Sequence, residues 1–320
     1  MTNTSFLRLI LAAGAACLPG PLLAKVPSVV TDMPAVQSLV QQVMGDLGQP
    51  AVLISQGGDP HHYQLRPSQA ASLQDADLLI WVGPEMTPWL DRSADALGAD
   101  RSLGLLALPQ TQRRAYAGDG DDDGDDDHGH DHGHEHEGEG EADHHHEGTD
   151  PHAWLNPQNG IVWLQGIAEA LAQRDPEHAA TYRANAQAGV KSIEALDQSL
   201  QARLAPVKDK PFVVFHDAYG YFTEHFGLPP AIPVSLGDAS TPSAARLAQI
   251  RDQIGASGAA CAFPELNHDA RLLDAVTEGS AVRQGAALDP EGTAAPQGAG
   301  LYATILDGIG GALADCLAAK

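Results

Sequence analysis

Short apolar runs alternate with helical patterns along this chain of 320 residues. Four runs are clear: Ala51–Ser55, Leu78–Val82, Phe212–Phe215 and Ala259–Phe263. A continuous apolar run of this length is typical of a strand that is buried on both faces of a parallel sheet. Between the first two runs, Pro67–Asp75 predicts a helix that begins at a proline. We therefore expect an α/β protein with two similar lobes, each a parallel sheet with flanking helices.

A longer helix is predicted between the two lobes. Asp175 and Pro176 form a typical helix start, and Pro206 would end the helix. Apolar residues recur every three or four positions between these points, at Tyr182, Ala186, Val190, Ile193, Leu196, Leu200 and Leu204. At about 1.5 Å per residue the helix would be about 45 Å long, enough to reach from one lobe to the other. We expect a first lobe of residues 25–175, a linker helix of residues 176–206 and a second lobe of residues 207–320.

The first 24 residues have the pattern of a secretory signal peptide. A positive charge, a short apolar run and a small residue follow one another: Arg8, Leu9–Leu18 and Ala24. The run is too short to span a bilayer. We expect cleavage after Ala24 and export to the periplasm, with no membrane insertion of the mature chain. A buried N-terminal helix and a lipoprotein cleaved before Cys17 are the alternatives.

Removal of the signal peptide would leave two cysteines, Cys261 and Cys316. Because a lone pair of cysteines in an oxidising compartment usually forms a bridge, we expect a disulfide between them. Closing this loop would contribute roughly 4 kcal/mol by chain entropy. Two buried free thiols are the alternative.

The formal net charge of the chain is −24. Binding to nucleic acid requires a basic surface, and so does docking on anionic lipid, so this charge argues against both classes of partner. Residues 119–147 alone contain fourteen acidic residues and no Lys or Arg. The rest of the chain has the charge of an ordinary acidic globular protein.

The same acidic segment holds eight histidines: His128, His130, His132, His134, His136, His144, His145 and His146. It contains no large apolar side chain, so we expect it to be disordered. Imidazole is a ligand that suits zinc, copper and nickel. We predict a secondary metal-binding loop of low affinity, with a purely solubilising acidic loop or an expression tag as the alternative.

Three further histidines occupy predicted loops at the ends of strands or before a helix. His61 follows the first apolar run, His152 precedes a helical pattern, and His216 ends the run at Phe212–Phe215. Ligands of open α/β sheets gather at the carboxyl ends of the strands. These three imidazoles are therefore candidates to converge, although each alone is a weak signal.

Several motifs occur together and in a fixed order. They are Gly58–Ser68 (GDPHHYQLRPS), Trp81–Met86 (WVGPEM), Asp150–Pro157 (DPHAWLNP), Val214–Phe222 (VFHDAYGYF) and Leu288–Gly292 (LDPEG). With these motifs the chain resembles the metal-binding lipoprotein/adhesin family of ABC importers, the cluster A-I substrate-binding proteins. The acidic histidine segment and the pair of cysteines are similar to those of its zinc branch, the ZnuA-type periplasmic zinc-binding proteins. The resemblance covers nearly all of the chain after residue 25.

The resemblance implies two α/β lobes joined by one rigid helix, with the metal held in the cleft between them. It implies that His61, His152 and His216 are metal ligands. Asp289 matches the acidic fourth ligand of the manganese branch. Zinc-branch members often use water or a Glu before the first histidine, but this chain has Pro60 there. The fourth ligand stays open between Asp289, a water molecule and His62.

The family further implies a monomer that delivers Zn²⁺, its transported substrate, to the membrane permease of an ABC transporter. Three imidazoles favour tetrahedral zinc, whereas manganese prefers more oxygen ligands. Glu265 lies where relatives often read Glu-Pro-Gln, and we do not expect it to be a ligand. Manganese-binding importer components and metal-binding adhesin or storage proteins are the alternatives. A zinc hydrolase is disfavoured because the sequence has no His-Glu-x-x-His motif, so we expect no enzyme activity.

Overall fold

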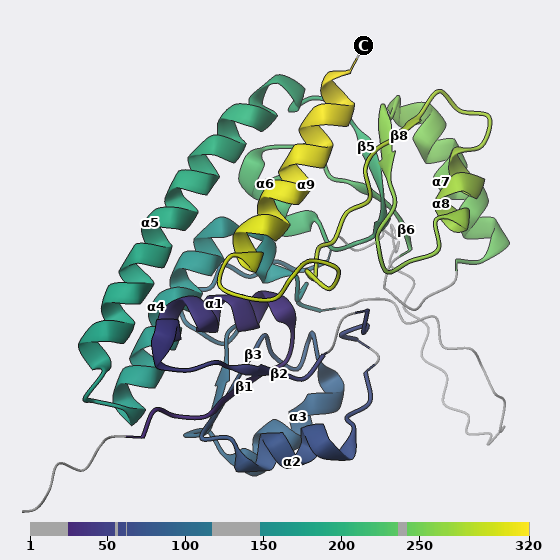
Figure 1. Ribbon diagram of the computed structural model, residues 1–320. Helices are drawn as coiled ribbons and strands as arrows, with labels where there is room; N and C mark the ends of the chain where they lie inside the picture. Colours follow the sequence, from purple (N-terminus) through teal and green to yellow (C-terminus); the bar gives the residue numbers. More distant parts are fainter. Residues whose placement is uncertain (1–24, 55–56, 62, 117–147, 236–241, 320) are drawn as a thin grey trace, which may run out of the picture.

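The computed structural model describes residues 25–54, 57–61, 63–116, 148–235 and 242–319. The described chain forms two lobes, each built on a four-stranded sheet (Figure 1). The first sheet has the order β2-β1-β3-β4, with β1 at Val29–Thr31, β2 at Ala51–Val52, β3 at Leu78–Trp81 and β4 at Ser102–Gly104. The second has the order β6-β5-β7-β8, with β5 at Phe212–His216, β6 at Ile232–Ser235, β7 at Cys261–Phe263 and β8 at Arg283–Gln284.

The two sheets share one topology. In each lobe the first strand pairs with the second strand on one side and with the third on the other, and the fourth strand lies at an edge. Every one of these pairings is parallel. The carboxyl ends of the strands therefore meet at one edge of each sheet, where α/β proteins place their ligands. The prediction of an α/β protein with two similar lobes is confirmed.

Helices of the first lobe begin at prolines. They are α1 at Pro34–Met44, α2 at Pro67–Asp75, α3 at Pro88–Leu97 and α4 at Pro157–Arg174. Proline suits the first helical turn because its fixed φ matches the helix and its missing N–H would have no partner inside the helix. Before α4, Asn156 also caps the helix, since its side chain accepts a hydrogen bond from the Gln158 N–H at 2.9 Å. The boundaries predicted for the helix Pro67–Asp75 are confirmed.

The linker helix α5 runs from Ala179 to Leu204, not from Pro176 as predicted. Residues 176–178 form a turn instead, and the Asp175 carboxylate holds this turn. It accepts hydrogen bonds from Nδ1 of His178 at 2.7 Å and from the hydroxyl of Tyr182 at 2.8 Å. The helix contacts α1 and α4 in the first lobe and, in the second, α9 at Leu301–Ala318. Figure 1 shows α5 extending alongside both lobes.

The second lobe adds α6 at Gly220–Phe226, α7 at Ala244–Ser257 and α8 at Arg271–Thr277. Three short 3₁₀ helices complete the described elements, at Gly45–Leu47, Ala153–Leu155 and Ala205–Val207. By length and composition α9 is apolar enough to cross a membrane. However, α9 packs against α5 and α1, and its apolar side chains belong to the hydrophobic core of the folded protein. The predicted disulfide between Cys261 and Cys316 is confirmed and joins β7 to α9.

One hydrophobic core passes through both lobes. It contains Trp154 and Trp163 from the first lobe together with Phe222 and Tyr302 from the second. Helices α4 and α9 approach so closely that a Cβ on Gly160 would lie 2.3 Å from the hydroxyl of Tyr302. The same hydroxyl donates a hydrogen bond to the Trp154 carbonyl at 2.8 Å. The lobes are therefore joined by packed side chains as well as by α5.

Three predicted features lie outside the described residues. They are the signal peptide of residues 1–24, the histidine-rich segment of residues 119–147 and the side chain of His62.

Candidate metal centre

His152 lies just before the 3₁₀ helix Ala153–Leu155, and its side chain is 1% exposed. Asp150 fixes the orientation of the ring. One oxygen of its carboxylate lies 2.8 Å from Nδ1 of His152 and also accepts the backbone N–H of the same residue at 3.0 Å. The buried Nε2 of His152 has no hydrogen-bond partner among the described residues. A neutral imidazole held in this way presents a lone pair to a metal ion.

Asp150 is itself held by the first and second lobes together. Burial alone would raise the pKa of this carboxyl, but hydrogen bonds from His152 and Arg114 outweigh burial and lower the pKa. Nη1 of Arg114 lies 2.6 Å from the Asp150 carboxylate. The guanidinium reaches α6, because a Cβ on Gly220 would lie 1.6 Å from the same nitrogen. The backbone carbonyl of Asp150 accepts a hydrogen bond from the hydroxyl of Tyr221 at 2.8 Å.

His216 occupies the last position of β5, at the carboxyl edge of the second sheet. Its Nδ1 lies 2.6 Å from a carboxylate oxygen of Glu265. The other oxygen of Glu265 accepts the hydroxyl of Tyr219 at 2.7 Å. Both residues of the His216–Glu265 pair are buried, with side chains 1% and 2% exposed. The second lobe therefore repeats the arrangement of the first, a histidine oriented by a buried carboxylate on Nδ1.

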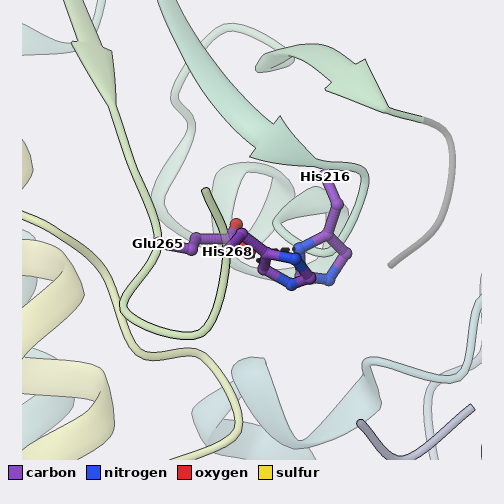
Figure 2. Close-up of side chains that lie close together, drawn as sticks. All are labelled: His216, Glu265 and His268. Carbon is purple, nitrogen blue, oxygen red and sulfur yellow. Dashed lines mark hydrogen bonds and ion pairs between the residues drawn. The ribbon is translucent and has the colours of Figure 1, made fainter. Parts of the chain in front are cut away.

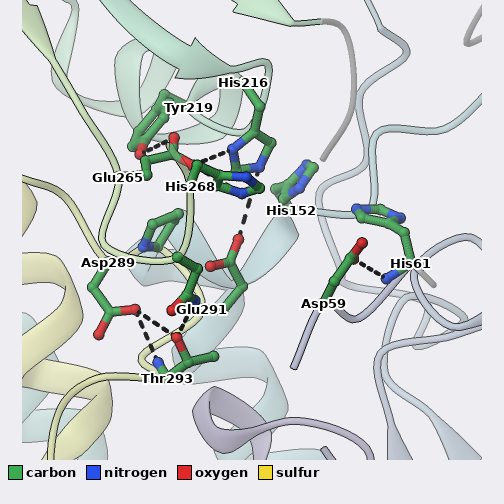
Figure 3. Close-up of polar contacts among 12 residues, drawn as sticks. Asp59, His61, His152, His216, Tyr219, Glu265, His268, Asp289, Glu291 and Thr293 are labelled. Carbon is green, nitrogen blue, oxygen red and sulfur yellow. Dashed lines mark hydrogen bonds and ion pairs between the residues drawn. The ribbon is translucent and has the colours of Figure 1, made fainter. Parts of the chain in front are cut away.

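The three predicted histidines lie side by side. The ring centroid of His152 is 5.7 Å from that of His61 and 5.4 Å from that of His216. His61 comes from the loop after β2, where its backbone N–H donates to the Asp59 carboxylate at 2.8 Å. Figure 3 shows the three rings in a row, two from the first lobe and one from the second. Rings at this spacing can approach one ion at zinc–nitrogen distances of about 2 Å.

Asp289, the predicted acidic candidate, faces a different group of atoms. One oxygen of its carboxylate accepts the backbone N–H of Thr293 at 2.9 Å, and the other accepts the backbone N–H of Ala294 at 2.9 Å. The hydroxyl of Thr293 adds a contact of 3.3 Å. Figure 3 shows the carboxylate turned toward Thr293. These bonds hold together the turn that carries Pro290 and Glu291.

Glu291 lies beside the histidines and was not anticipated from the sequence. It is 3% exposed, and one oxygen of its carboxylate is 3.8 Å from Nε2 of His216. Its backbone is fixed to the first lobe, because the carbonyl of Pro290 accepts the indole N–H of Trp154 at 2.8 Å. The motif Leu288–Gly292 contains both Asp289 and Glu291, but only the path of the turn decides which carboxylate faces the histidines. In the sequence, the only sign of a role for Glu291 is that it is a second acidic residue in this motif, two positions after Asp289.

His268 also lies against this group. Its ring centroid is 5.9 Å from that of His216, and its Nε2 is 3.6 Å from a carboxylate oxygen of Glu265. His268 was not among the ligand candidates from the sequence, although it follows the apolar run Ala259–Phe263. His178 and His225 instead contact Asp175 and Asp197, away from the three rings.

The centre is rich in buried acidic groups. Asp150, Glu265 and Glu291 are buried next to the imidazoles. Burial, followed by the charge of Asp150, raises the pKa of the neighbouring Asp217. Buried carboxylates require a cation or hydrogen bonds to be stable. Imidazole nitrogens together with carboxylate oxygens are a donor set that suits a divalent transition metal such as zinc.

Comparisons with known proteins place the chain in a family. Residues 29–316 match the model of the family described as zinc-uptake complex component A, periplasmic. The chain is 65% identical to the high-affinity zinc uptake system protein ZnuA of Paracoccus denitrificans over 100% of both chains. It is 40% identical to the protein of the same name from Brucella abortus, over 90% of this chain and 91% of the relative.

The fold has a solved counterpart. A crystal structure of ZnuA superposes with a TM-score of 0.71 and 23% identity, covering 91% of this chain and 99% of the other. A similarity at this level of identity supports the two-lobe fold. The family match extends over most of the chain and over both lobes, and the chain belongs to the family of periplasmic zinc-uptake complex component A.

Proposed function

We propose that this chain is the zinc-binding component of an ABC importer. It binds Zn²⁺ in the periplasm as transported cargo and delivers the ion to a membrane permease. One observation carries the proposal: His61 and His152 from the first lobe lie beside His216 from the second, with a buried carboxylate on Nδ1 of two of these rings. Orienting carboxylates of this kind are typical of zinc-binding histidines.

We propose that the ligands are His61, His152 and His216 and that Glu291 supplies the fourth donor. Glu291 is favoured over Asp289 because both oxygens of Asp289 already accept backbone N–H groups. It is favoured over water because it lies 3.8 Å from Nε2 of His216 inside the buried group. His62 is outside the described residues. Three nitrogens and one oxygen favour tetrahedral zinc over manganese, which prefers more oxygen ligands.

A zinc ion bound by four protein donors is typical of a binding protein and not of a zinc hydrolase. A hydrolytic zinc keeps one open position for water, with a general base beside it. Glu265, a buried carboxylate of the centre, is engaged by both Tyr219 and His216. We therefore propose that the chain binds and releases the ion without catalysing a reaction.

We further propose that the chain is cleaved after Ala24 and works in the periplasm as a monomer. The family is named as periplasmic, and the Cys261–Cys316 disulfide suits an oxidising compartment. Mass spectrometry of the exported protein would test the cleavage site, and sedimentation would test the monomer. An N-terminus other than Lys25, or a dimer at working concentration, would overturn the corresponding proposal.

The metal and the ligands are tested by metal analysis of untagged protein, followed by competition titrations with zinc and manganese. In one series, His61, His152 and His216 are each replaced by Ala. We expect one tight zinc in the parent, preference for zinc over manganese, and a loss of affinity in each variant larger than the about 10- to 100-fold typical for residues that only orient a ligand. Tight zinc binding by the triple variant, or turnover of ester and peptide substrates by the zinc-loaded parent, would overturn the proposal.

A further inference from the structure

The second lobe holds a compact group of metal-binding side chains of its own. His216, Glu265 and His268 each offer a ligand atom, and these three atoms all lie within 4.8 Å of one another. His216 ends β5, and the other two residues follow β7. Figure 2 shows the two rings next to each other, with the carboxylate of Glu265 pointing toward them. No residue of the first lobe belongs to this group.

His268 is placed for metal binding by packing. Its ring is stacked on the ring of Phe215, with a centroid separation of 4.3 Å and an interplanar angle of 17°. The side chain is 16% exposed, whereas the side chain of His216 is 1% exposed. His268 therefore lies at the solvent side of the centre, and the ring of Phe215 limits the positions that its nitrogens can take.

The spacing of the donors matches that of ligands around one ion. The ring centroids of His268 and His216 are 5.9 Å apart, close to the 5.4 Å between His152 and His216. Nε2 of His268 lies 3.6 Å from the carboxylate of Glu265. Two donors at about 2 Å from a tetrahedral zinc ion are separated by a similar distance. Two imidazoles and a carboxylate are also an established zinc donor set.

We infer that His268, with His216 and the adjoining carboxylate of Glu291, forms an auxiliary zinc position on the second lobe, while Glu265 keeps its hydrogen bond to Nδ1 of His216. The inference rests on the proposed function of the chain. An ion leaving the tight site keeps His216, gives up His61 and His152, and gains His268. The exchange replaces two neutral imidazoles by one, and a water molecule from the solvent takes the remaining position, so the charge of the donor set does not change. It lets the first lobe release the ion before the second lobe does.

The shared core makes such a stepwise path useful. Because Trp154, Tyr302 and α5 join the lobes, we expect the ligands of the two lobes to separate only slightly in one movement. An ion that lost every ligand at once would face the full cost of breaking all its bonds. His268 lies on the more exposed side of the centre and offers a ligand on the way out.

The test uses the full-length chain with the eight histidines of residues 119–147 replaced by Asn, so that they do not bind zinc. In this background the first-lobe ligands are removed by His61→Ala with His152→Ala, and zinc affinity is measured by competition with a chelator. His268→Phe is then added, since Phe keeps a ring against Phe215 but has no nitrogen. We expect residual zinc binding in the double variant and a further loss of at least tenfold with His268→Phe. With both first-lobe ligands intact, His268→Phe should change the affinity by less than threefold.

His225→Phe is the matched control, because His225 belongs to the same lobe and its Nε2 contacts Asp197 at 2.7 Å, away from the centre. Absence of residual binding in the double variant, or equal binding with and without His268, would overturn the auxiliary position. If His268→Phe, with both first-lobe ligands intact, lowered zinc affinity as much as His152→Ala does, His268 would be a ligand of the tight site. This result would also overturn the auxiliary position. Wild-type affinity in the double variant would instead overturn the proposed tight site. The melting temperatures of the metal-free proteins show whether each variant is folded. If the double variant does not fold, His61→Ala alone serves as the background, because His61 lies in a loop and its replacement should disturb folding less.

Discussion

Nδ1 of His216 lies 2.6 Å from a carboxylate oxygen of Glu265, and the hydroxyl of Tyr219 donates to the other oxygen of the same carboxylate at 2.7 Å. All three side chains are buried. The carboxylate therefore fixes which nitrogen of His216 carries a proton and which faces the first lobe. In the proposed site, Glu265 would act on zinc through His216, and that it is not itself a ligand of the tight site stays a prediction.

Glu265→Gln should lower zinc affinity by about 10- to 100-fold, because an amide holds the imidazole less firmly and makes it a weaker donor. Competition titration with zinc measures the effect. Glu278→Gln is the matched control, since Glu278 lies in the same lobe and is exposed. Equal affinities for the two variants would contradict the role assigned to Glu265.

Glu291 and Asp289 should respond differently to removal of their charges. Glu291→Gln should weaken zinc binding and leave the metal-free protein at least as stable, because a buried charge is removed. Asp289→Asn should mainly lower the melting temperature, since it loses an acceptor for the N–H of Thr293 or Ala294. Metal-free melting curves and zinc titrations of both variants separate these effects. A larger loss of zinc affinity in Asp289→Asn would restore Asp289 as the ligand.

Asp32 should make the stability of the metal-free protein depend on pH. It is fully buried and accepts the backbone N–H groups of Val82 and Met33 at 2.8 Å each, but burial dominates and raises its pKa to about 7. The unfolded carboxyl has a pKa near 3.9, so between about pH 4 and 7 the folded state binds more protons than the unfolded state. The contribution of Asp32 to stability is therefore present at low pH and is lost as pH rises through 7.

Asp32→Asn tests this assignment, because other titrating groups are common to the variant and the parent. From pH 5 to pH 8 the melting temperature of the parent should fall relative to that of the variant. Parallel pH profiles would mean that the two backbone N–H groups keep Asp32 ionised in the folded state at pH 5.

The Cys261–Cys316 disulfide joins β7 to the C-terminal helix α9 across a sequence separation of 55 residues. In exported protein neither cysteine should react with a thiol reagent until a reductant is added. Replacing both by Ser should reduce the free energy of unfolding by about 2–5 kcal/mol, mainly because the unfolded chain gains freedom. Two reactive thiols in untreated protein, or unchanged stability of the variant, would oppose the prediction.

Long periodic patterns and polar motifs predicted most of what the structure contains. The repeat from Tyr182 to Leu204 predicted α5, and Pro67 marked the start of α2. The strands β1, β4, β6 and β8 were missed, because runs of two to four residues carry too little pattern to be separated from loops. The start of α5 was placed too early, because Asp-Pro suits a turn as well as a helix cap.

Some residues of the metal centre were likewise predicted from the sequence, and others were not. His61, His152 and His216 were predicted from motifs at the ends of predicted elements. His268 also follows a predicted strand run, Ala259–Phe263, but the stacking of its ring on Phe215, which orients it at the centre, is a contact between residues far apart in sequence. Glu291 depends on the turn that Asp289 holds, and Gly292 permits that turn with a φ of +74°. Side-chain direction in a turn is set by contacts distant in sequence, which a single sequence does not reveal.

Zinc should stabilise the folded protein and change its overall dimensions little. The unfolded chain has no preformed site, so zinc at a hundredfold excess over its dissociation constant should add about 2.7 kcal/mol to the free energy of unfolding. Movement between the lobes is limited by α5, which contains no proline, and by buried hydrogen bonds from Trp154 to Pro290 and from Tyr302 to Trp154. Thermal melts and small-angle scattering with and without zinc measure the two effects, in the background where Asn replaces the eight histidines of residues 119–147. Trp154→Phe removes the bond to Pro290 and should increase the difference in radius of gyration between the metal-free and zinc-bound states. A large change in radius in the parent, or no shift of its melting temperature with zinc, would show that the lobes open as separate bodies.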